Sequence, residues 1–301
     1  MKKASNVVLL GDDVFLIHKV VIPAAGLGTR LLPATKETPK EMLPIFALDK
    51  KGEVCIKPLL QVIFESFYDI GLREFCFIVG RGKESISDHF TSDSSFLREL
   101  KETGKNELVE ELVSFYEKAN ISSLVFISQP EPKGFGDAVL KAEPYVKEPF
   151  LVQAGDTIIL SKKSQHLKKL VKVHEETKSA ATILVGEVED PRPFGIIKGK
   201  EVDAGIYDVE MVVEKPEKPP SNLAISAVYV FSPAIFSALK SIPKSPGKEL
   251  QLTDGIQKLI DSGLKVTAVK LDKDEFWLDV GSPQTYWKAL CQAHRFYEEG
   301  D

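Results

Sequence analysis

Short apolar runs alternate with amphipathic stretches through the first half of the chain. The runs are rich in β-branched and aromatic residues, which predicts buried strands at 19–23, 75–79, 124–127 and 150–154. Between them, apolar residues recur at helical spacing, which predicts helices at 58–70, 83–90, 107–118 and from about Gly136. The polar stretch 91–95 is expected to be a loop. This alternation predicts an α/β fold with a largely parallel sheet covered on both faces.

The pattern changes after a lysine-rich amphipathic helix predicted at 162–174. Strand-like stretches follow with few helices between them, at 180–187, 195–198, 207–213 and 224–231. They predict an antiparallel or mixed extension of the sheet that holds a second ligand.

Capping signals mark two later helices. Asp254 has Gln257 three residues on, which is capping-box spacing, and Ser282 and Pro283 can begin a last helix at 283–297. No linker, repeat or low-complexity tract interrupts the chain. We therefore expect one continuous domain over 19–301, preceded by an N-terminal extension over 1–18.

A glycine-rich turn follows the first predicted strand. Residues 21–31 read VIPAAGLGTRL, and residues 36–44 read KETPKEMLP. Glycines let backbone N–H groups approach a polyphosphate closely, while Arg30 and Lys40 add fixed positive charge. A Rossmann fingerprint would need a third glycine where Leu31 stands, and a Walker A loop would need Gly-Lys-Ser/Thr. The pattern favours a phosphate-binding loop over a purely structural turn.

Charge and cysteine content narrow the class of protein. A formal net charge of -5 argues against a nucleic-acid-binding surface, and no apolar run is long enough to span a membrane. Asp12 and Asp13 interrupt the only stretch that resembles a signal peptide. Three scattered cysteines favour a reducing, cytoplasmic location. His166 and His174 are expected on the solvated face of the lysine-rich helix rather than in a ligand site.

Candidate site segments fall where parallel strands end. These segments are the Gly26 loop, the residues from Gln129 onward, and Gly155 with Asp156. Asp156 and Asp279 each end an apolar strand, where an isolated carboxylate would be poorly solvated. A hard cation with oxygen ligands explains two such groups far apart in the sequence.

Taken together, these motifs resemble those of the bacterial-type UTP–glucose-1-phosphate uridylyltransferase family, a branch of the sugar nucleotidyltransferases. The resemblance covers about residues 19–297. It rests on the two motifs above and on Gln129 with Gly134, Gly155-Asp156, Glu214-Lys215-Pro216, Gln251-Leu252-Thr253-Asp254 and Asp279-Val280-Gly281. It implies a single-domain, Rossmann-like α/β/α sandwich with a mixed, mostly parallel sheet. The nucleotide would bind to about 19–160 and the sugar to about 161–280.

The resemblance also implies residue roles. Nucleotide-binding positions would be Ala24, Ala25, Gly26, Gly28, Thr29, Arg30, Gln129, Gly134, Gly155 and Asp156. Sugar-binding positions would be Gly195, Glu214, Lys215 and Ile225. Arg30, Lys40 and Lys215 would act in catalysis, and Asp156 and Asp279 would hold Mg²⁺. Other interpretations stay open: Lys40 on a solvated loop, a strand-edge salt bridge between Glu214 and Lys215, and Tyr229 in the core rather than at the sugar.

The implied reaction joins UTP and glucose 1-phosphate into UDP-glucose and releases pyrophosphate. A rival hypothesis is a thymidylyltransferase, whose lysine motif typically reads K-Q-L-L-P where this chain has K-E-M-L-P. A second rival is a non-catalytic relative that binds nucleotide sugars, but Lys40, Asp156 and Asp279 are all present.

Base choice would involve the side-chain amide of Gln129. That amide can meet the N3–H and O4 of uracil, yet a flipped amide would pair with cytosine equally well. Rejection of cytosine therefore requires a group that cannot flip, such as backbone groups near Ala25 and Gly134. We expect strong preference for UTP over purine nucleotides, good rejection of CTP and some use of dTTP.

Two features fall outside the motifs. Residues 48–56 look like an inserted hairpin. The last helix has one apolar stripe at Tyr286, Leu290, Ala293 and Tyr297 and a second at Trp287 and Cys291. A terminal helix that is apolar on two sides predicts a homo-oligomer, a dimer or tetramer, that uses this helix.

Overall fold

Side chains alternate between two faces of one central sheet, because successive residues of a strand point in opposite directions. A computed structural model describes residues 8–10, 13–15, 17–243 and 247–298. In this part of the chain, nine strands form the sheet in the order β10-β14-β12-β11-β13-β8-β3-β6-β7, with β10 also paired to β13. Their bounds are β3 Lys19–Ala24, β6 Glu74–Gly80, β7 Ser123–Gln129, β8 Phe150–Gln153, β10 Ala181–Glu187, β11 Gly195–Asp203, β12 Ile206–Glu214, β13 Leu223–Phe231 and β14 Val266–Lys270.

The two halves of the sheet differ in strand direction. β3, β6, β7 and β8 run parallel to one another, whereas β13 is antiparallel to both β8 and β10. β11 and β12 form a further antiparallel pair, next to β13 on the side away from β8. β10 and β14 are also parallel to each other. The mixed sheet predicted from the sequence is therefore confirmed, with most of its parallel pairs among the strands of the first half of the chain.

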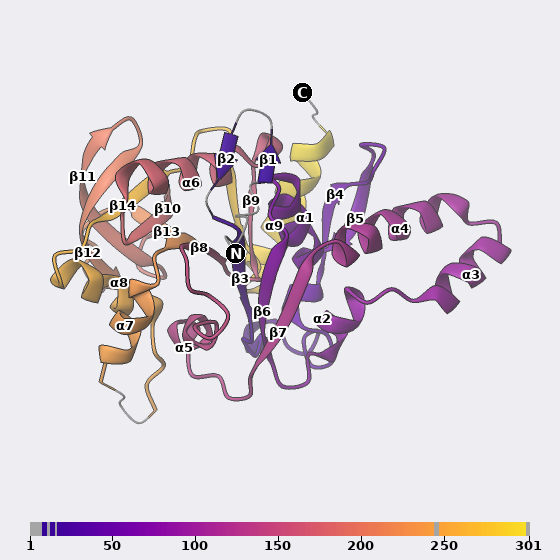
Figure 1. The fold of residues 1–301 in the computed structure, drawn as a ribbon, viewed down its shortest axis with the longest axis horizontal. Coiled ribbons are helices and arrows are strands. Elements are labelled where there is room, and N and C mark those ends of the chain that lie inside the picture. The colour runs from indigo at the N-terminus through magenta and orange to yellow at the C-terminus, as the bar shows by residue number, and fades with distance from the viewer. Residues whose placement is uncertain (1–7, 11–12, 16, 244–246, 299–301) are drawn as a thin grey trace, which may run out of the picture.

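Helices cover both faces of the sheet and bury two apolar clusters (Figure 1). On one face, a single buried cluster combines residues of α1 Leu59–Asp69, α4 Asn106–Asn120, α6 Gln165–Thr177 and α9 Pro283–Glu298 with sheet residues such as Val20 and Ile22. On the other, α5 Phe135–Lys141, α7 Ala234–Ser241 and α8 Leu252–Asp261 pack against residues such as Val21. The predicted three-layer arrangement is confirmed.

Two local predictions were wrong. Residues 91–95 do not form only a loop, because α3 Ser94–Glu102 begins there and the Asp93 side chain accepts from the N–H groups of Ser95 and Phe96 as its N-cap. Asp254 is not an N-cap, because α8 already begins at Leu252 and Asp254 lies in its first turn. A carboxylate is favourable both as an N-cap and in the first turn of a helix, so the presence of Asp254 did not show at which residue α8 begins.

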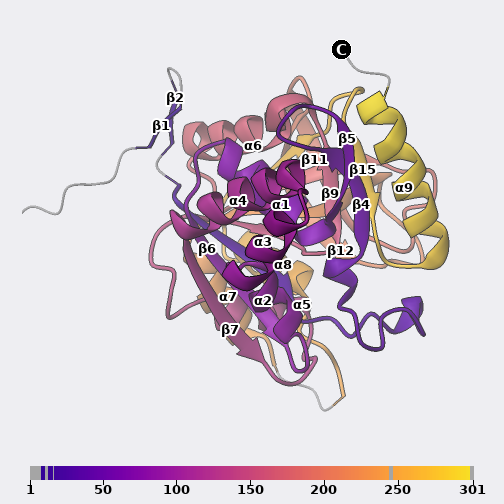
Figure 2. The same ribbon diagram turned by 90° about the vertical axis from the view of Figure 1, so that its right-hand side faces the viewer.

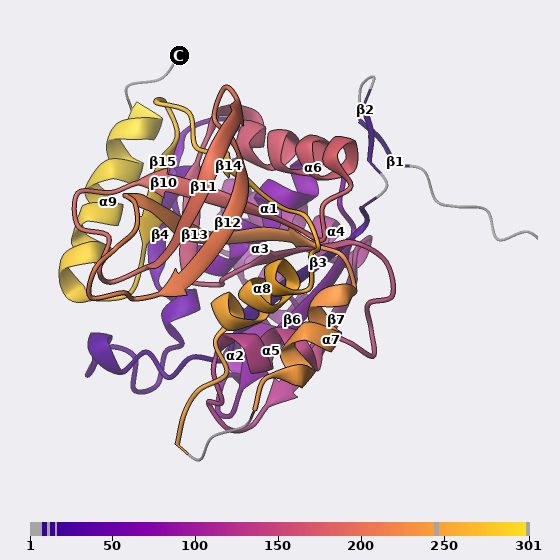
Figure 3. The same cartoon turned by 90° about the vertical axis from the view of Figure 1, so that its left-hand side faces the viewer.

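Within the described residues, three small antiparallel pairs stand outside the main sheet. β4 Pro44–Leu48 and β5 Val54–Pro58 form the hairpin predicted around 48–56, which packs against α9 (Figure 2). β9 Thr157–Leu160 pairs with β15 Phe276–Asp279. β1 Val8–Leu10 pairs with β2 Asp13–Phe15 on the side of the molecule away from α9 (Figure 3), while the rest of the N-terminal extension up to residue 16 lies outside the described residues. α2 Glu84–His89 is a further short α-helix, after β6. Among these described helices, none is long and apolar enough to cross a membrane.

His166 and His174 are buried, which contradicts the solvated face expected for them. Both lie on the side of α6 that packs on the sheet, and His174 Nδ1 is 2.9 Å from Thr182 Oγ1. The lysines of α6 dominate its composition but do not show which side faces the core. Burial lowers the pKa of His174 to about 4.

Replacement of His174 by asparagine is expected to flatten the pH dependence of stability. Between about pH 6.5 and 4 the unfolded imidazole binds a proton that the folded one does not, so wild-type stability is lost as pH falls through this window. The variant should lack roughly 1.4 kcal/mol per pH unit of this slope. Urea unfolding at pH 6 and pH 5 measures it, and equal slopes in both proteins would contradict a neutral buried His174.

Candidate active site

The loop that follows β3 leaves its backbone exposed to a cavity. Gly28 has φ 65°, and its carbonyl accepts from Thr35 Oγ1 at 2.8 Å and from the Leu31 N–H at 2.9 Å. Only a single 3₁₀ turn, Thr29–Leu31, follows the loop, which agrees with the absence of a Rossmann helix at this point. At Gly80, where β6 ends, an added Cβ would lie 2.9 Å from the Ala25 carbonyl oxygen. The loop is therefore held closely against the neighbouring strand.

Lys40 reaches back over this loop. Its Nζ forms an ion pair with Asp156, and an added Cβ at Gly26 would lie 3.3 Å from Nζ. Burial alone would lower the pKa of Lys40, but the charges of Asp156, Glu41 and Asp279 outweigh it and raise the pKa above its ordinary value. The Lys40 side chain is 15% exposed, so the solvated loop lysine that the sequence left open is not what the structure contains.

Asp156 and Asp279 are brought together by strand pairing. Asp279 lies opposite Thr157 in the β9–β15 pair, and the Val280 N–H donates to the Asp156 carbonyl at 2.9 Å. Burial, and then the charge of Asp156, raise the pKa of Asp279. An added Cβ at Gly281 would lie 2.5 Å from Asp279 Oδ2 and 2.8 Å from Arg30 Nη2, so the glycine leaves room for Arg30 to approach this carboxylate.

Gln129 ends β7 at the same edge of the sheet. Its Nε2 donates to Asp137 Oδ2 at 2.7 Å and to the Gly134 carbonyl at 3.2 Å. Gly134 has φ 102°, and an added Cβ would lie 2.5 Å from the Leu250 carbonyl oxygen. Glycine is required here both for the backbone conformation and for this close approach.

A cavity of about 310 Å³ gathers most of the predicted nucleotide residues. It is lined by Pro23, Ala25, Gly26, Leu27, Gly28, Thr29, Lys40, Glu41, Gln129, Pro132, Gly134, Phe135, Ala138, Asp156 and Glu249. Ala24, Arg30 and Gly155 do not line this cavity: Ala24 ends β3, Arg30 lies beside Gly281, and the Gly155 N–H donates to the Pro23 carbonyl. The structure thus brings together the segments that follow β3 and β7 and the segment that precedes β9.

The predicted sugar residues form a separate group at the β11–β12 end of the sheet. Gly195 pairs with Glu214, and an added Cβ at Gly195 would lie 3.3 Å from Ile225 Cδ1. Glu214 accepts from Thr253 Oγ1 at 3.1 Å, and Lys215 Nζ lies 3.2 Å from Glu214 Oε1. Lys215 has φ 42°, a strained conformation for a residue other than glycine. Tyr229 is buried, which favours the core position left open for it.

Comparison with known proteins decides the family. The model of the Nucleotidyl transferase family matches residues 19–295. The chain belongs to the nucleotidyl transferase family. It is 39% identical over 281 residues to the UTP–glucose-1-phosphate uridylyltransferase of Staphylococcus haemolyticus, with 92% of each chain covered.

Solved structures agree with this assignment. A UDP-glucose pyrophosphorylase complexed with UDP-glucose is 30% identical and has a TM-score of 0.78, over 94% of this chain and 100% of the other. A UTP-bound UGPase from Acinetobacter baumannii is 28% identical and has a TM-score of 0.81, over 93% of this chain and 94% of the other. The predicted family and fold class of this nucleotidyl transferase are therefore confirmed.

Sequence reasoning missed a buried ion pair beneath the loop of this nucleotidyl transferase. Glu41 is 1% exposed, and its Oε2 lies 2.7 Å from Nζ of Lys83, which also donates to the Ala24 carbonyl at 2.6 Å. Burial raises the pKa of Glu41 and lowers that of Lys83. The ion pair connects the Lys40 segment, which contains Glu41, with the segment after β6, which contains Lys83. The hydrogen bond from Lys83 to Ala24 adds a connection to the end of β3. Nothing in the local pattern around Lys83 distinguishes it from a surface lysine.

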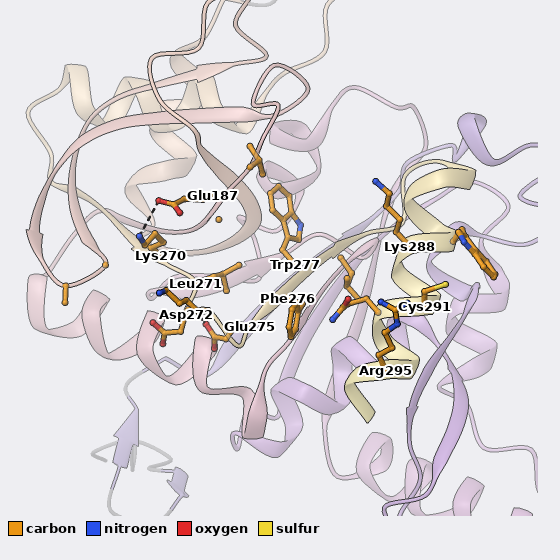
Figure 4. Close-up of a pocket in the computed structure, with 18 residues that line it drawn as sticks. Glu187, Lys270, Leu271, Asp272, Glu275, Phe276, Trp277, Lys288, Cys291 and Arg295 are labelled. Atoms are coloured by element: carbon orange, nitrogen blue, oxygen red, sulfur yellow. Dashed lines mark hydrogen bonds and ion pairs between the residues drawn. The ribbon is translucent and has the colours of Figure 1, made fainter. Parts of the chain in front are cut away.

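A larger groove of about 980 Å³ lies between α9 and the end of the sheet that carries β10 and β14. Figure 4 shows Lys288, Cys291 and Arg295 on the α9 side and Phe276 and Trp277 on the other. None of its lining residues also lines the 310 Å³ cavity described above. The groove is therefore a separate surface feature of this nucleotidyl transferase.

Proposed function

We propose that this nucleotidyl transferase converts UTP and glucose 1-phosphate into UDP-glucose and pyrophosphate. The observation that carries the proposal is the ion pair of Lys40 with Asp156 above Gly26, because it places a cation, a carboxylate and a glycine-rich backbone in one cavity. The names of the relatives above support the same substrates.

The nucleotide would lie along the loop with its base toward Gln129. Backbone N–H groups from Ala25 to Thr29 would contact the phosphates, and Gln129 would contact the base. The sugar would lie at the second group, where the Glu214 carboxylate accepts hydroxyl hydrogen bonds and Lys215 contacts the sugar phosphate. The segment before α8 and the first turn of that helix connect the two groups, because the Leu250 carbonyl accepts from the Gly136 N–H at 2.9 Å and Thr253 Oγ1 donates to Glu214.

The proposed reaction is a direct displacement at phosphorus. A phosphate oxygen of glucose 1-phosphate attacks the α-phosphorus of UTP, and the bond from that phosphorus to the pyrophosphate oxygen breaks. Lys40 and Arg30 would offset the negative charge that develops, and no covalent intermediate with the protein is required.

The two carboxylates fit a magnesium ion. Among the residues that the structure describes, no group of three or more His, Cys, Asp or Glu side chains could hold a metal. Magnesium at nucleotide sites typically takes one or two carboxylates together with substrate phosphates and water, which matches Asp156 and Asp279. When bound, it would supply charge neutralisation at the phosphates.

Initial rates with each of UTP, dTTP, CTP, ATP and GTP against several sugar 1-phosphates, with and without Mg²⁺, test the proposal. We expect the highest kcat/KM for UTP with glucose 1-phosphate and Mg²⁺. A higher value for dTTP would favour the thymidylyltransferase, and no turnover with any pair would favour a non-catalytic binding protein.

We also propose that the chain assembles as a homo-oligomer through α9. Trp287 is 67% exposed on this helix, and Leu48, Val54 and Ile56 are exposed on the β4–β5 hairpin, which packs against the same helix. An exposed tryptophan on an element that also carries or contacts other exposed apolar side chains is typical of a protein interface.

Replacement of Trp287 by glutamate is expected to weaken this assembly roughly tenfold or more, since a tryptophan at an interface often contributes 2 kcal/mol or more. Light scattering over a micromolar dilution series measures the dissociation constant. Leu264→Glu, at an exposed apolar residue that follows α8, is the matched control. A wild-type protein that is monomeric throughout would refute the proposal.

A further inference from the structure

The amide of Gln129 has only one stable orientation. Both of its N–H groups have acceptors, Asp137 Oδ2 at 2.7 Å and the Gly134 carbonyl at 3.2 Å. Asp137 lies in the first turn of α5, and Gly134 precedes that helix. The side chain of Gln129 is buried between them, with 4% of the residue exposed.

A flipped amide would be unfavourable at this position. It would place Oε1 against a carboxylate oxygen and a carbonyl oxygen, neither of which carries a hydrogen to donate. The Gly134 carbonyl cannot easily move away, because Leu250 packs directly against the Gly134 backbone. An ionised aspartate accepts hydrogen bonds and cannot donate them, so Asp137 admits only the Nε2 group.

Gln129 consequently offers the base a single kind of hydrogen-bonding atom. Gln129 lines the nucleotide cavity, and its Oε1 has no hydrogen-bond partner in the described part of the chain. We propose that Asp137 is a positioning residue for base selection: it fixes Gln129 so that only the carbonyl oxygen of the amide faces the pyrimidine. This inference rests on the proposed function, in which Gln129 contacts the base of UTP.

The fixed acceptor distinguishes the two common pyrimidines. Uracil has an N3–H that can donate to Gln129 Oε1, whereas N3 of cytosine is itself an acceptor and would face Oε1 without a proton between them. Thymine has the same N3–H as uracil. Asp137 should therefore control the choice of UTP over CTP and leave the choice of UTP over dTTP unaffected.

This role differs from a purely structural one. A carboxylate in the first turn of a helix also interacts favourably with the helix dipole, and loss of that interaction would alter stability. It would not alter the ratio of kcat/KM for two nucleotides that differ at the base. The selectivity ratio separates the two roles.

The Asp137→Asn variant tests the proposal directly. An asparagine amide has both donors and an acceptor, so position 137 would no longer oppose a flipped Gln129, and only the longer 3.2 Å contact with the Gly134 carbonyl would still favour the present orientation. We expect the ratio of kcat/KM for UTP over that for CTP to fall roughly 10- to 100-fold, with glucose 1-phosphate as the second substrate. The ratio for UTP over dTTP should stay at the wild-type value. Glu131→Gln, an exposed carboxylate-to-amide change in the loop after β7 whose partner is Lys133, is the matched control.

A second variant, Asp137→Ser, supports the test if Asp137→Asn does not fold as judged by thermal unfolding. A serine hydroxyl can donate or accept, so it would likewise remove the constraint that the Asp137 carboxylate places on the orientation of Gln129. A UTP-to-CTP ratio that stays at the wild-type value in a folded variant overturns the role of Asp137. Absence of UTP turnover in the wild-type protein would instead overturn the proposed function, so the two failures are distinguishable.

Discussion

Replacement of Asp279 by asparagine is expected to lower kcat/KM for UTP and glucose 1-phosphate by roughly 10²- to 10³-fold, about 3 to 4 kcal/mol of transition-state stabilisation. The variant keeps the shape of the side chain but loses the charge that faces Asp156 and Arg30. In the absence of a cation, burial and the charge of Asp156 raise the pKa of Asp279, so this carboxylate is poised to gain from a bound cation. The fold should be unaffected, because the β9–β15 pairing uses backbone groups.

Steady-state kinetics and circular dichroism of Asp279→Asn measure these two effects. Asp274→Asn, an exposed aspartate before β15, is the matched control and should retain wild-type kinetics. Activity should also be lost in excess chelator and return with Mg²⁺. Full activity in chelator, or in Asp279→Asn, would contradict the assignment of a cation to Asp156 and Asp279.

Replacement of Lys83 by methionine is expected to lower the free energy of unfolding by about 3 kcal/mol or more. The substitution removes the partner of a buried carboxylate, and an uncompensated buried charge typically costs about 3 to 5 kcal/mol. Lys83 also donates to the Ala24 carbonyl, so the glycine-rich loop after β3 should lose a support as well. The double variant Glu41→Leu with Lys83→Met removes both charges and should regain much of the lost stability.

Urea unfolding of the single and double variants measures this coupling. Lys258→Met is the matched control, because Lys258 pairs with Asp261 at 3.8 Å on the surface, where such pairs contribute about 1 kcal/mol or less. A Lys83→Met protein as stable as the control would show that Glu41 does not depend on this partner. Equal losses in the single and double variants would show that packing, rather than charge, explains the effect.

The order of the elements could be predicted because it depends on local pattern. Apolar runs of strand length, helical spacing of apolar residues and the Ser282-Pro283 start of α9 are each properties of neighbouring residues. The glycine-rich turn was identifiable for the same reason, since the backbone freedom of Gly26 and Gly28 is intrinsic to those residues. Where two local interpretations were equally favourable, as for Asp254 near the start of α8, the boundary was misplaced.

The candidate site required contacts between residues that are distant in sequence. Asp156 was expected to end a strand, but β8 ends at Gln153 and Asp156 immediately precedes β9. Only the register of β9 against β15 places Asp156 beside the residues that follow Asp279. The same holds for Lys83, whose ion pair depends on the parallel arrangement of β3 and β6.

The sequence by itself determined which chemical groups this protein carries and the order of strands and helices that present them. Tertiary structure alone decided which of those groups meet and which are buried. His174 illustrates the difference, because the lysines around it indicated a surface helix while packing on the sheet buries that side of α6. Asp137 illustrates the same difference at the candidate site. From the sequence its carboxylate could have faced solvent, whereas in the structure it accepts a hydrogen bond from Gln129 Nε2. Local pattern reports the periodicity of a segment, whereas pairing and burial depend on partners that only the folded chain brings into contact.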